Sequence, residues 1–112
     1  MLHLVRDLAT PDQIAQMLAD WEVLIKVVVD IRREILTGGG EMHADGEALL
    51  LADGSQQEDL WGANWYPTSR DIRFEALINI RPRQNNRRMQ VESEALRNTM
   101  EAIVRRILEG RS

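Results

Sequence analysis

The sequence predicts an α+β fold, in which a small antiparallel sheet packs with about four helices. Two patterns lead to this prediction. Residues 58–66 and 71–81 have the composition and alternation of a strand hairpin. Residues 92–109 carry the apolar stripe of an amphipathic helix. Runs of strands followed by helices are typical of α+β folds, so we expect an antiparallel sheet with helices on one face.

Length and composition are those of an ordinary globular domain. The chain has 112 residues, 44% hydrophobic and 29% charged, so we expect one domain over residues 1–112 with a substantial core. The sequence contains no apolar run of about 18 residues, the length needed to span a membrane, and no signal-peptide pattern. Cysteine is absent, which excludes disulfides, thiol nucleophiles and Cys-based zinc sites. These features predict a soluble, cytoplasmic protein without a membrane partner.

Three helices are predicted from local signals. Thr10 is a good cap and Pro11 suits a first helical position, so a helix is expected over 11–20. Residues 45–53 are rich in Leu and Ala, which favours a helix, although Asp53-Gly54 is also typical of a hairpin turn. The helix over 92–109 is expected to begin near Ser93 and to end at Gly110.

Residues 22–37 are ambiguous. The run Val27-Val28-Val29 favours a strand. In contrast, apolar residues recur at helical spacing through the segment, and Gly38-Gly39-Gly40 is a good helix stop. We adopt the helix as the fourth of the predicted helices.

The strands are expected at two places. Residues 59–66 and the alternating residues 72–81 form the hairpin, with a turn at Pro67-Thr68-Ser69. A short N-terminal strand around Leu2 and Leu4 joins the sheet in this interpretation. Trp61 and Trp65 fall on one face of their strand, where we expect core or interface anchors. If the chain is a structural subunit, Tyr66 and both tryptophans are expected in a subunit contact.

Charge is distributed unevenly along the chain. The net charge is −4, yet residues 1–69 carry a net −8 and residues 70–112 a net +4. This split is typical of an anionic partner at the basic half, or of attraction between the halves within or between subunits. Because an acidic protein is a poor general nucleic-acid binder, we expect a homo-oligomer or a small anionic ligand rather than a nucleic acid.

The first candidate site is the loop over 81–88. It concentrates donors suited to phosphate, carboxylate or amide groups, which predicts an anion-binding or partner-binding loop. A salt-bridge role against the acidic half, or a plain solvated loop, are the structural alternatives. The candidate ligand-binding residues are Arg81, Arg83, Gln84, Asn85, Asn86 and Arg87.

The second candidate site is His43, Asp45 and Glu47. On a strand, these three side chains share a face and suit a divalent metal, whereas at a helix start they do not converge. This competing hypothesis is a metal-assisted hydrolase or nuclease, with Arg81 stabilising the transferring group. The sequence has no P-loop or hydrolase-triad motif. We therefore expect no cofactor and leave catalysis open.

Three segments together resemble a known family. They are Gly38-Gly39-Gly40-Glu41-Met42-His43-Ala44-Asp45, then Asp53-Gly54-Ser55-Gln56-Gln57-Glu58-Asp59-Leu60-Trp61-Gly62, and Ala76-Leu77-Ile78-Asn79-Ile80-Arg81-Pro82-Arg83-Gln84-Asn85-Asn86-Arg87. The combination resembles a bacterial family of uncharacterised proteins, domain of unknown function 5674. The resemblance implies a stand-alone protein of this size and no known activity. Its pattern has Ser where this chain has Arg88, so Arg88 is left out of the candidate site.

Overall fold

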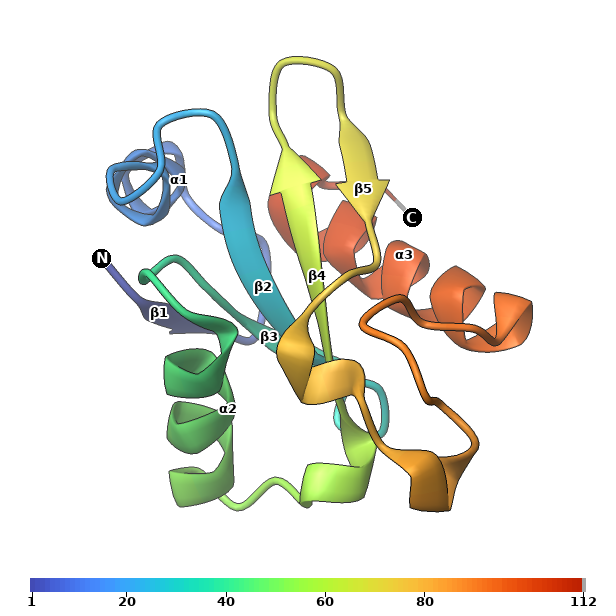
Figure 1. The fold of residues 1–112 in the computed structure, drawn as a ribbon. Helices are drawn as coiled ribbons and strands as arrows, with labels where there is room; N and C mark the ends of the chain where they lie inside the picture. The colour runs from blue at the N-terminus through green and yellow to red at the C-terminus, as the bar shows by residue number, and fades with distance from the viewer. Residues whose placement is uncertain (112) are drawn as a thin grey trace.

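The computed structural model describes residues 1–111 and confirms the α+β class. Five antiparallel strands form one sheet in the order β1-β3-β2-β4-β5 (Figure 1). None of the helices within residues 1–111 has the length and apolar character needed to cross a membrane. The strands are β1 (His3–Val5), β2 (Ile25–Asp30), β3 (Ile35–Gly38), β4 (Leu60–Tyr66) and β5 (Asp71–Arg73), and the helices are α1 (Pro11–Leu18), α2 (His43–Ala52) and α3 (Glu94–Glu109).

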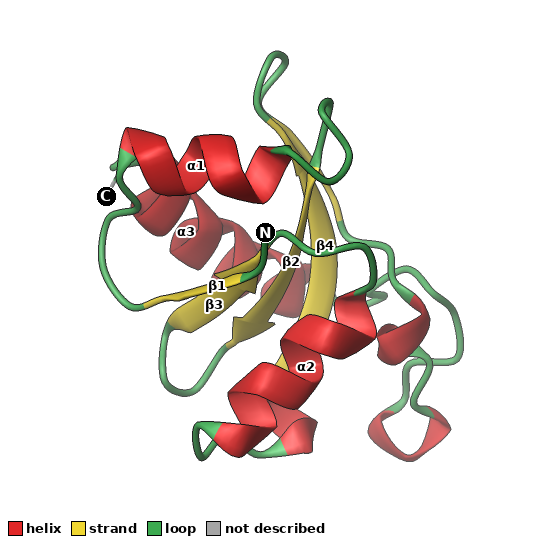
Figure 2. Ribbon diagram, turned by 90° about the vertical axis from the view of Figure 1, so that its left-hand side faces the viewer, coloured by secondary structure: helices red, strands yellow, loops and turns green. Residues whose placement is uncertain are grey.

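Helices cover both faces of the sheet, so the prediction of one covered face was wrong. Figure 2 shows the sheet between α1 and α3 on one side and α2 on the other. Successive side chains of β2 therefore enter different clusters, because strand residues alternate between faces. Val27 and Val29 pack with Met100 of α3, whereas Val28 packs with Leu50 of α2. The larger core lies on the α1 and α3 side.

The three confirmed helices begin and end close to their predicted positions. Thr10 forms a capping box with Gln13: the Thr10 hydroxyl accepts from the Gln13 amide at 3.1 Å, and the Gln13 side chain accepts from the Thr10 amide at 3.0 Å. Ser93 caps α3, and Gly110 ends it in the left-handed conformation. Local capping chemistry was therefore a reliable guide to helix boundaries.

The predicted helix over 22–37 is wrong, because this segment contains β2 and β3 joined by a tight turn. The carboxylate of Asp30 accepts hydrogen bonds from the amides of Arg32 and Arg33, both at 2.9 Å. Glu34 then takes a positive φ of 56° and closes the turn. The valine run lies in the centre of the sheet, where both faces are buried, so β2 lacks the simple alternation of a one-sided strand.

The β4–β5 hairpin is confirmed, but the second strand is much shorter than the predicted 71–81. It ends at Arg73, and residues 77–79 form a short 3-10 turn. Past Arg73, the side chain of Asn79 takes the place of a neighbouring strand. Its Oδ1 accepts from the Gly62 amide at 2.8 Å and its Nδ2 donates to the Gly62 carbonyl at 2.9 Å. One side-chain amide thus mimics the pairing of a strand residue with β4.

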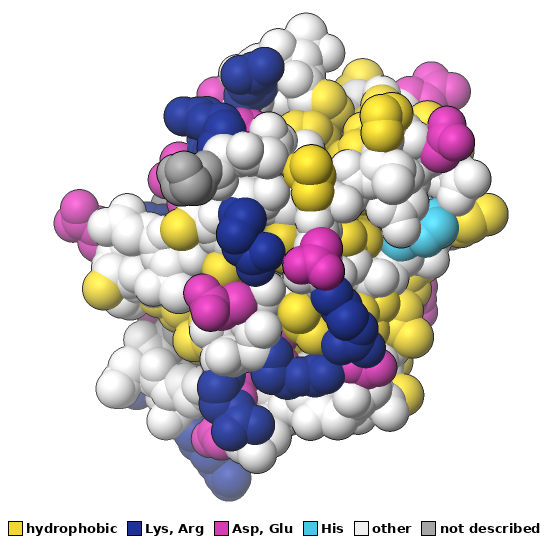
Figure 3. Space-filling model, turned by 180° about the vertical axis from the view of Figure 1, so that it is seen from behind, with side chains coloured by type: hydrophobic (Ala, Val, Ile, Leu, Met, Phe, Trp, Pro, Cys, Tyr) yellow, Lys and Arg dark blue, Asp and Glu magenta, His cyan; other side chains and the backbone are white. Residues whose placement is uncertain are grey.

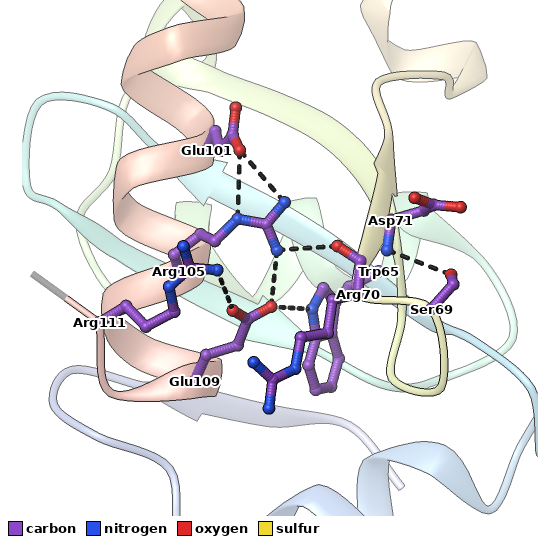
Figure 4. Close-up of polar contacts among 8 residues, drawn as sticks. All are labelled: Trp65, Ser69, Arg70, Asp71, Glu101, Arg105, Glu109 and Arg111. Atoms are coloured by element: carbon purple, nitrogen blue, oxygen red, sulfur yellow. Dashed lines mark hydrogen bonds and ion pairs between the residues drawn. The ribbon is translucent and has the colours of Figure 1, made fainter.

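Several arginines of the basic C-terminal half are bound within the chain. Arg105 of α3 contacts both Glu101 and Glu109, and Glu109 also accepts from the Trp65 indole at 2.8 Å (Figure 4). On the face seen in Figure 3, Lys and Arg side chains lie among Asp and Glu side chains. Both ion pairs lie within α3, whereas the Trp65 bond and the donation of Arg105 to the Arg70 carbonyl at 2.8 Å fasten α3 to the β4–β5 hairpin. Within residues 1–111 no ion pair joins residues 1–69 to residues 70–112, so ion pairs inside the chain do not account for the charge asymmetry of the sequence.

Candidate functional site

The first candidate loop belongs to a longer irregular segment, residues 75–90, which we call the 75–90 excursion. It is built around two buried asparagines. Asn79 also donates to the Met89 carbonyl at 3.0 Å. Asn86, 3% exposed, donates from Nδ2 to the carbonyls of Asn79 and Arg88, and its Oδ1 accepts from the Glu92 amide at 2.8 Å. Buried amides that bind main chain in this way hold an irregular segment in one conformation.

The side chain of Arg81 has a structural role, because it binds main-chain carbonyls rather than an acidic side chain. Its Nη1 donates to the Gln57 carbonyl at 2.6 Å, and its Nη2 donates to the Leu60 carbonyl. The guanidinium lies 3.8 Å from the centre of the Trp61 ring. Burial lowers the pKa of Arg81, and the nearby Glu47 carboxylate acts in the opposite direction. These contacts leave Arg81 less available for a ligand than the sequence suggests.

The other predicted loop residues divide into two groups. Gln84 donates to the Glu58 carbonyl at 3.0 Å, and Asn85 takes a left-handed φ of 60° in the turn. Arg83 and Arg87 instead have exposed side chains, which form no ion pair within residues 1–111. A shallow hollow of about 410 Å³ lies along this loop and is lined by Arg81, Arg83 and Gln84 among others. Arg83 and Arg87 are therefore the loop cations that remain free to bind a partner.

The second candidate group lies on α2, where its three side chains are not brought together. No group of three or more His, Asp or Glu side chains within residues 1–111 is arranged to hold a metal ion. Asp45 is exposed, whereas one buried carboxylate oxygen of Glu47, Oε2, lacks a hydrogen-bond partner. His43 instead hydrogen bonds through Nε2 to the Ala63 carbonyl at 2.8 Å. A helix separates these residues because positions i, i+2 and i+4 do not share one face.

His43 is held in a neutral, oriented state. Burial lowers its pKa below the usual value, and the nearby Lys26 charge acts in the same direction. The hydrogen bond to the Ala63 carbonyl acts oppositely without reversing the shift. Because a neutral ring that bonds a carbonyl must donate, Nε2 carries the proton and Nδ1 the lone pair.

Exposed apolar side chains form a feature that the loop and metal predictions missed. Leu77, Ile80 and Met89 of the 75–90 excursion are 68%, 43% and 45% exposed. On α2, Leu49 and Leu51 are 36% and 41% exposed. The sequence holds a signal for the second pair: residues 48–52 are Ala-Leu-Leu-Leu-Ala, so the second half of the helix is apolar on every side.

The two tryptophans of β4 lie in the core, as one of the alternatives expected. Trp61 and Trp65 are 4% and 5% exposed and belong to the larger core cluster. They are therefore not surface anchors for a subunit contact.

Comparison with known proteins gives a family but no activity. Neither a curated protein nor a solved structure matches the chain. The family described as "Protein of unknown function (DUF5674)" matches residues 3–107, which is nearly the whole chain. The chain therefore belongs to this family of unknown function.

Proposed function

We propose that the protein is a small non-enzymatic interaction module that binds an acidic partner surface, and that a second copy of the chain supplies this surface. The observation behind the proposal is the composition of α2. Leu50 is fully buried against the sheet, yet Leu49 and Leu51 on other sides of the helix remain exposed. A helical segment that is apolar on all sides is normally buried, and residues 48–52 of α2 are Ala or Leu throughout. A partner that covers its outer side accounts for this composition.

The 75–90 excursion supplies the complementary half of the same face. It lies beside α2 on the side seen in Figure 1. Its exposed apolar side chains stand next to the free cations Arg83 and Arg87. Glu41 and Asp45, at the start of α2, are exposed acidic side chains. A two-fold axis through this face sets α2 of each copy against the excursion of the other, which pairs opposite charges around an apolar centre.

This proposal keeps the anionic partner expected for residues 81–87, but it assigns the contact to Arg83 and Arg87. Arg81, Gln84 and Asn86 support it indirectly, because they hold the excursion in shape. A rigid loop binds with a smaller loss of conformational entropy than a flexible one.

The test is the mass of the protein in solution, measured by sedimentation equilibrium. We expect wild type to be a dimer and Arg83→Glu with Arg87→Glu to be a monomer with an unchanged circular dichroism spectrum. The charge-retaining pair Arg83→Lys with Arg87→Lys is the matched control and is expected to remain a dimer. Adding Glu41→Arg and Asp45→Arg to the Glu variant is expected to restore association. A wild-type monomer at every accessible concentration contradicts the proposal, and so does a dimer that charge reversal leaves intact.

A further inference from the structure

A cleft lies between the first turn of α2, the sheet and the 75–90 excursion. It encloses about 290 Å³, and most of its lining is apolar, including Ala76, Ile78 and Met89. Small-molecule sites are typically mainly apolar hollows of this order with a few polar groups that fix orientation. The cleft shares Leu77 and Met89 with the proposed partner surface, but a small molecule in it does not require a second copy of the chain.

The only lysine of the chain lines this cleft. Arginine supplies every other basic side chain among the 14 Lys and Arg residues. Lys26 lies in β2, on the face of the sheet that α2 covers, and its Nζ lies 4.6 Å from the centre of the Trp21 ring. It forms no ion pair within the described part of the chain. An ammonium group without a carboxylate partner, at an apolar cleft, has the chemistry to bind an anion.

Other polar groups of the lining surround the same point. Asn64 is the cross-strand neighbour of Lys26, and the NH2 group of its side chain is of the kind that donates to a carboxylate. The ring of His43 is fixed by the Ala63 carbonyl. No side chain caps α2 at Met42, and the Asp45 amide donates to the Met42 carbonyl at 3.1 Å, which leaves the amides of His43 and Ala44 for a ligand. These amides add to the positive potential that Lys26 provides.

We infer that this cleft binds a small organic carboxylate with an apolar body, such as a short aliphatic or a one-ring aromatic acid. The carboxylate contacts Lys26 and the first turn of α2, and the apolar body lies along Ala76, Ile78 and Met89. The charges favour a single negative charge on the ligand. One lysine and a helix end face the cleft, while Glu75 at its edge opposes a more highly charged group.

The single lysine makes the test direct, because Lys26 is the only side-chain amine that an acylating reagent can modify. Octanoate and phenylacetate are the probes, and octanamide and phenylacetamide are their uncharged controls. We expect the acids, but not the amides, to protect Lys26 from acetylation by an N-hydroxysuccinimide ester, as read by peptide mass spectrometry. The same acids are expected to shift the amide NMR signals of His43, Ala44 and Asn64.

Two variants separate a specific contact from general attraction. Lys26→Met is expected to weaken binding of both acids by about tenfold or more, since a hydrogen bond to a charged group contributes roughly 1.5–3 kcal/mol. Arg73→Met is the control, because Arg73 is the cross-strand neighbour of Asn64 but does not line the cleft, and it is expected to change affinity by less than about twofold. Binding of neither acid, equal binding of acids and amides, or equal losses in the two variants overturns the inference.

The outcome is independent of the proposed dimer. The acids are also tested on Arg83→Glu with Arg87→Glu, which leaves the cleft lining unchanged. Retained binding in this variant is expected, whatever its mass in solution, and loss of binding there contradicts the assignment to the cleft.

Discussion

Replacement of Asn79 by alanine is expected to destabilise the fold strongly, although the residue lies outside every helix and strand. Asn79 is fully buried and makes three hydrogen bonds to main chain, two of them to Gly62 at 2.8 and 2.9 Å. Alanine leaves the amide and carbonyl of Gly62 and the carbonyl of Met89 without these partners. Each unsatisfied buried group costs roughly 1–3 kcal/mol. Partial relaxation brings the expected total to about 3–5 kcal/mol, a large part of the stability of a typical domain.

The measurement is urea unfolding followed by tryptophan fluorescence and circular dichroism, which gives the free energy of unfolding by linear extrapolation. Asn98→Ala is the matched control, because Asn98 is exposed on α3, and its effect is expected to stay within about 0.5 kcal/mol. A loss below about 1 kcal/mol for Asn79→Ala refutes the reasoning, since the side chain then does not replace a strand neighbour of β4.

Three further changes test other parts of the structure. Burial alone raises the pKa of Glu109, but hydrogen bonds from Trp65 and the neighbouring arginines lower it overall. The carboxylate therefore stabilises the folded state fully above the pKa of the unfolded chain, and this stabilisation is lost as pH falls through the lower pKa of the folded state. Glu109→Gln is therefore expected to reduce the loss of stability measured by urea unfolding between about pH 5 and pH 2. Gly46→Ala is expected to destabilise by about 1–2 kcal/mol in thermal unfolding, because the new Cβ lies 2.4 Å from Thr37 Oγ1 and the resulting strain exceeds the gain in helix propensity. Arg81→Lys is expected to lower the free energy of unfolding, measured in urea, by about 1–3 kcal/mol, since one ammonium group does not replace both guanidinium contacts. Arg83→Lys is the control and is expected to leave this free energy unchanged. Equal effects of the two substitutions contradict the division of the loop into structural and free arginines.

Local signals in the sequence predicted those parts of the fold that depend on neighbours along the chain. The cap at Thr10, the stop at Gly110 and the strand composition of residues 59–66 each act over a few residues, and each is confirmed. The same reasoning failed for residues 22–37. There, burial of β2 on both faces removed the alternation of a strand, and apolar residues fell by coincidence at helical spacing. Long-range pairing of β2 with β4, which no local pattern encodes, decided the outcome.

The candidate site was predictable only as a segment. The composition of residues 81–88 identified the loop, but it did not separate Arg81, which binds main chain, from Arg83 and Arg87, which do not. That separation depends on the carbonyls of Gln57 and Leu60, which come from a different part of the chain. The cleft at Lys26 was also beyond local reasoning, because its lining is assembled from α2, two strands and the 75–90 excursion.

The most direct test of the proposed interaction surface is an isotope-filtered NMR experiment on a mixed sample. One copy carries ¹³C-labelled leucine methyl groups, and the other carries unlabelled leucine with labelled isoleucine and methionine methyls. The account predicts intermolecular contacts from Leu49 and Leu51 of α2 to Ile80 and Met89 of the excursion, because all four side chains are exposed in the isolated chain and need a partner to cover them. A dimer whose intermolecular contacts lie elsewhere, or a sample without any, contradicts it.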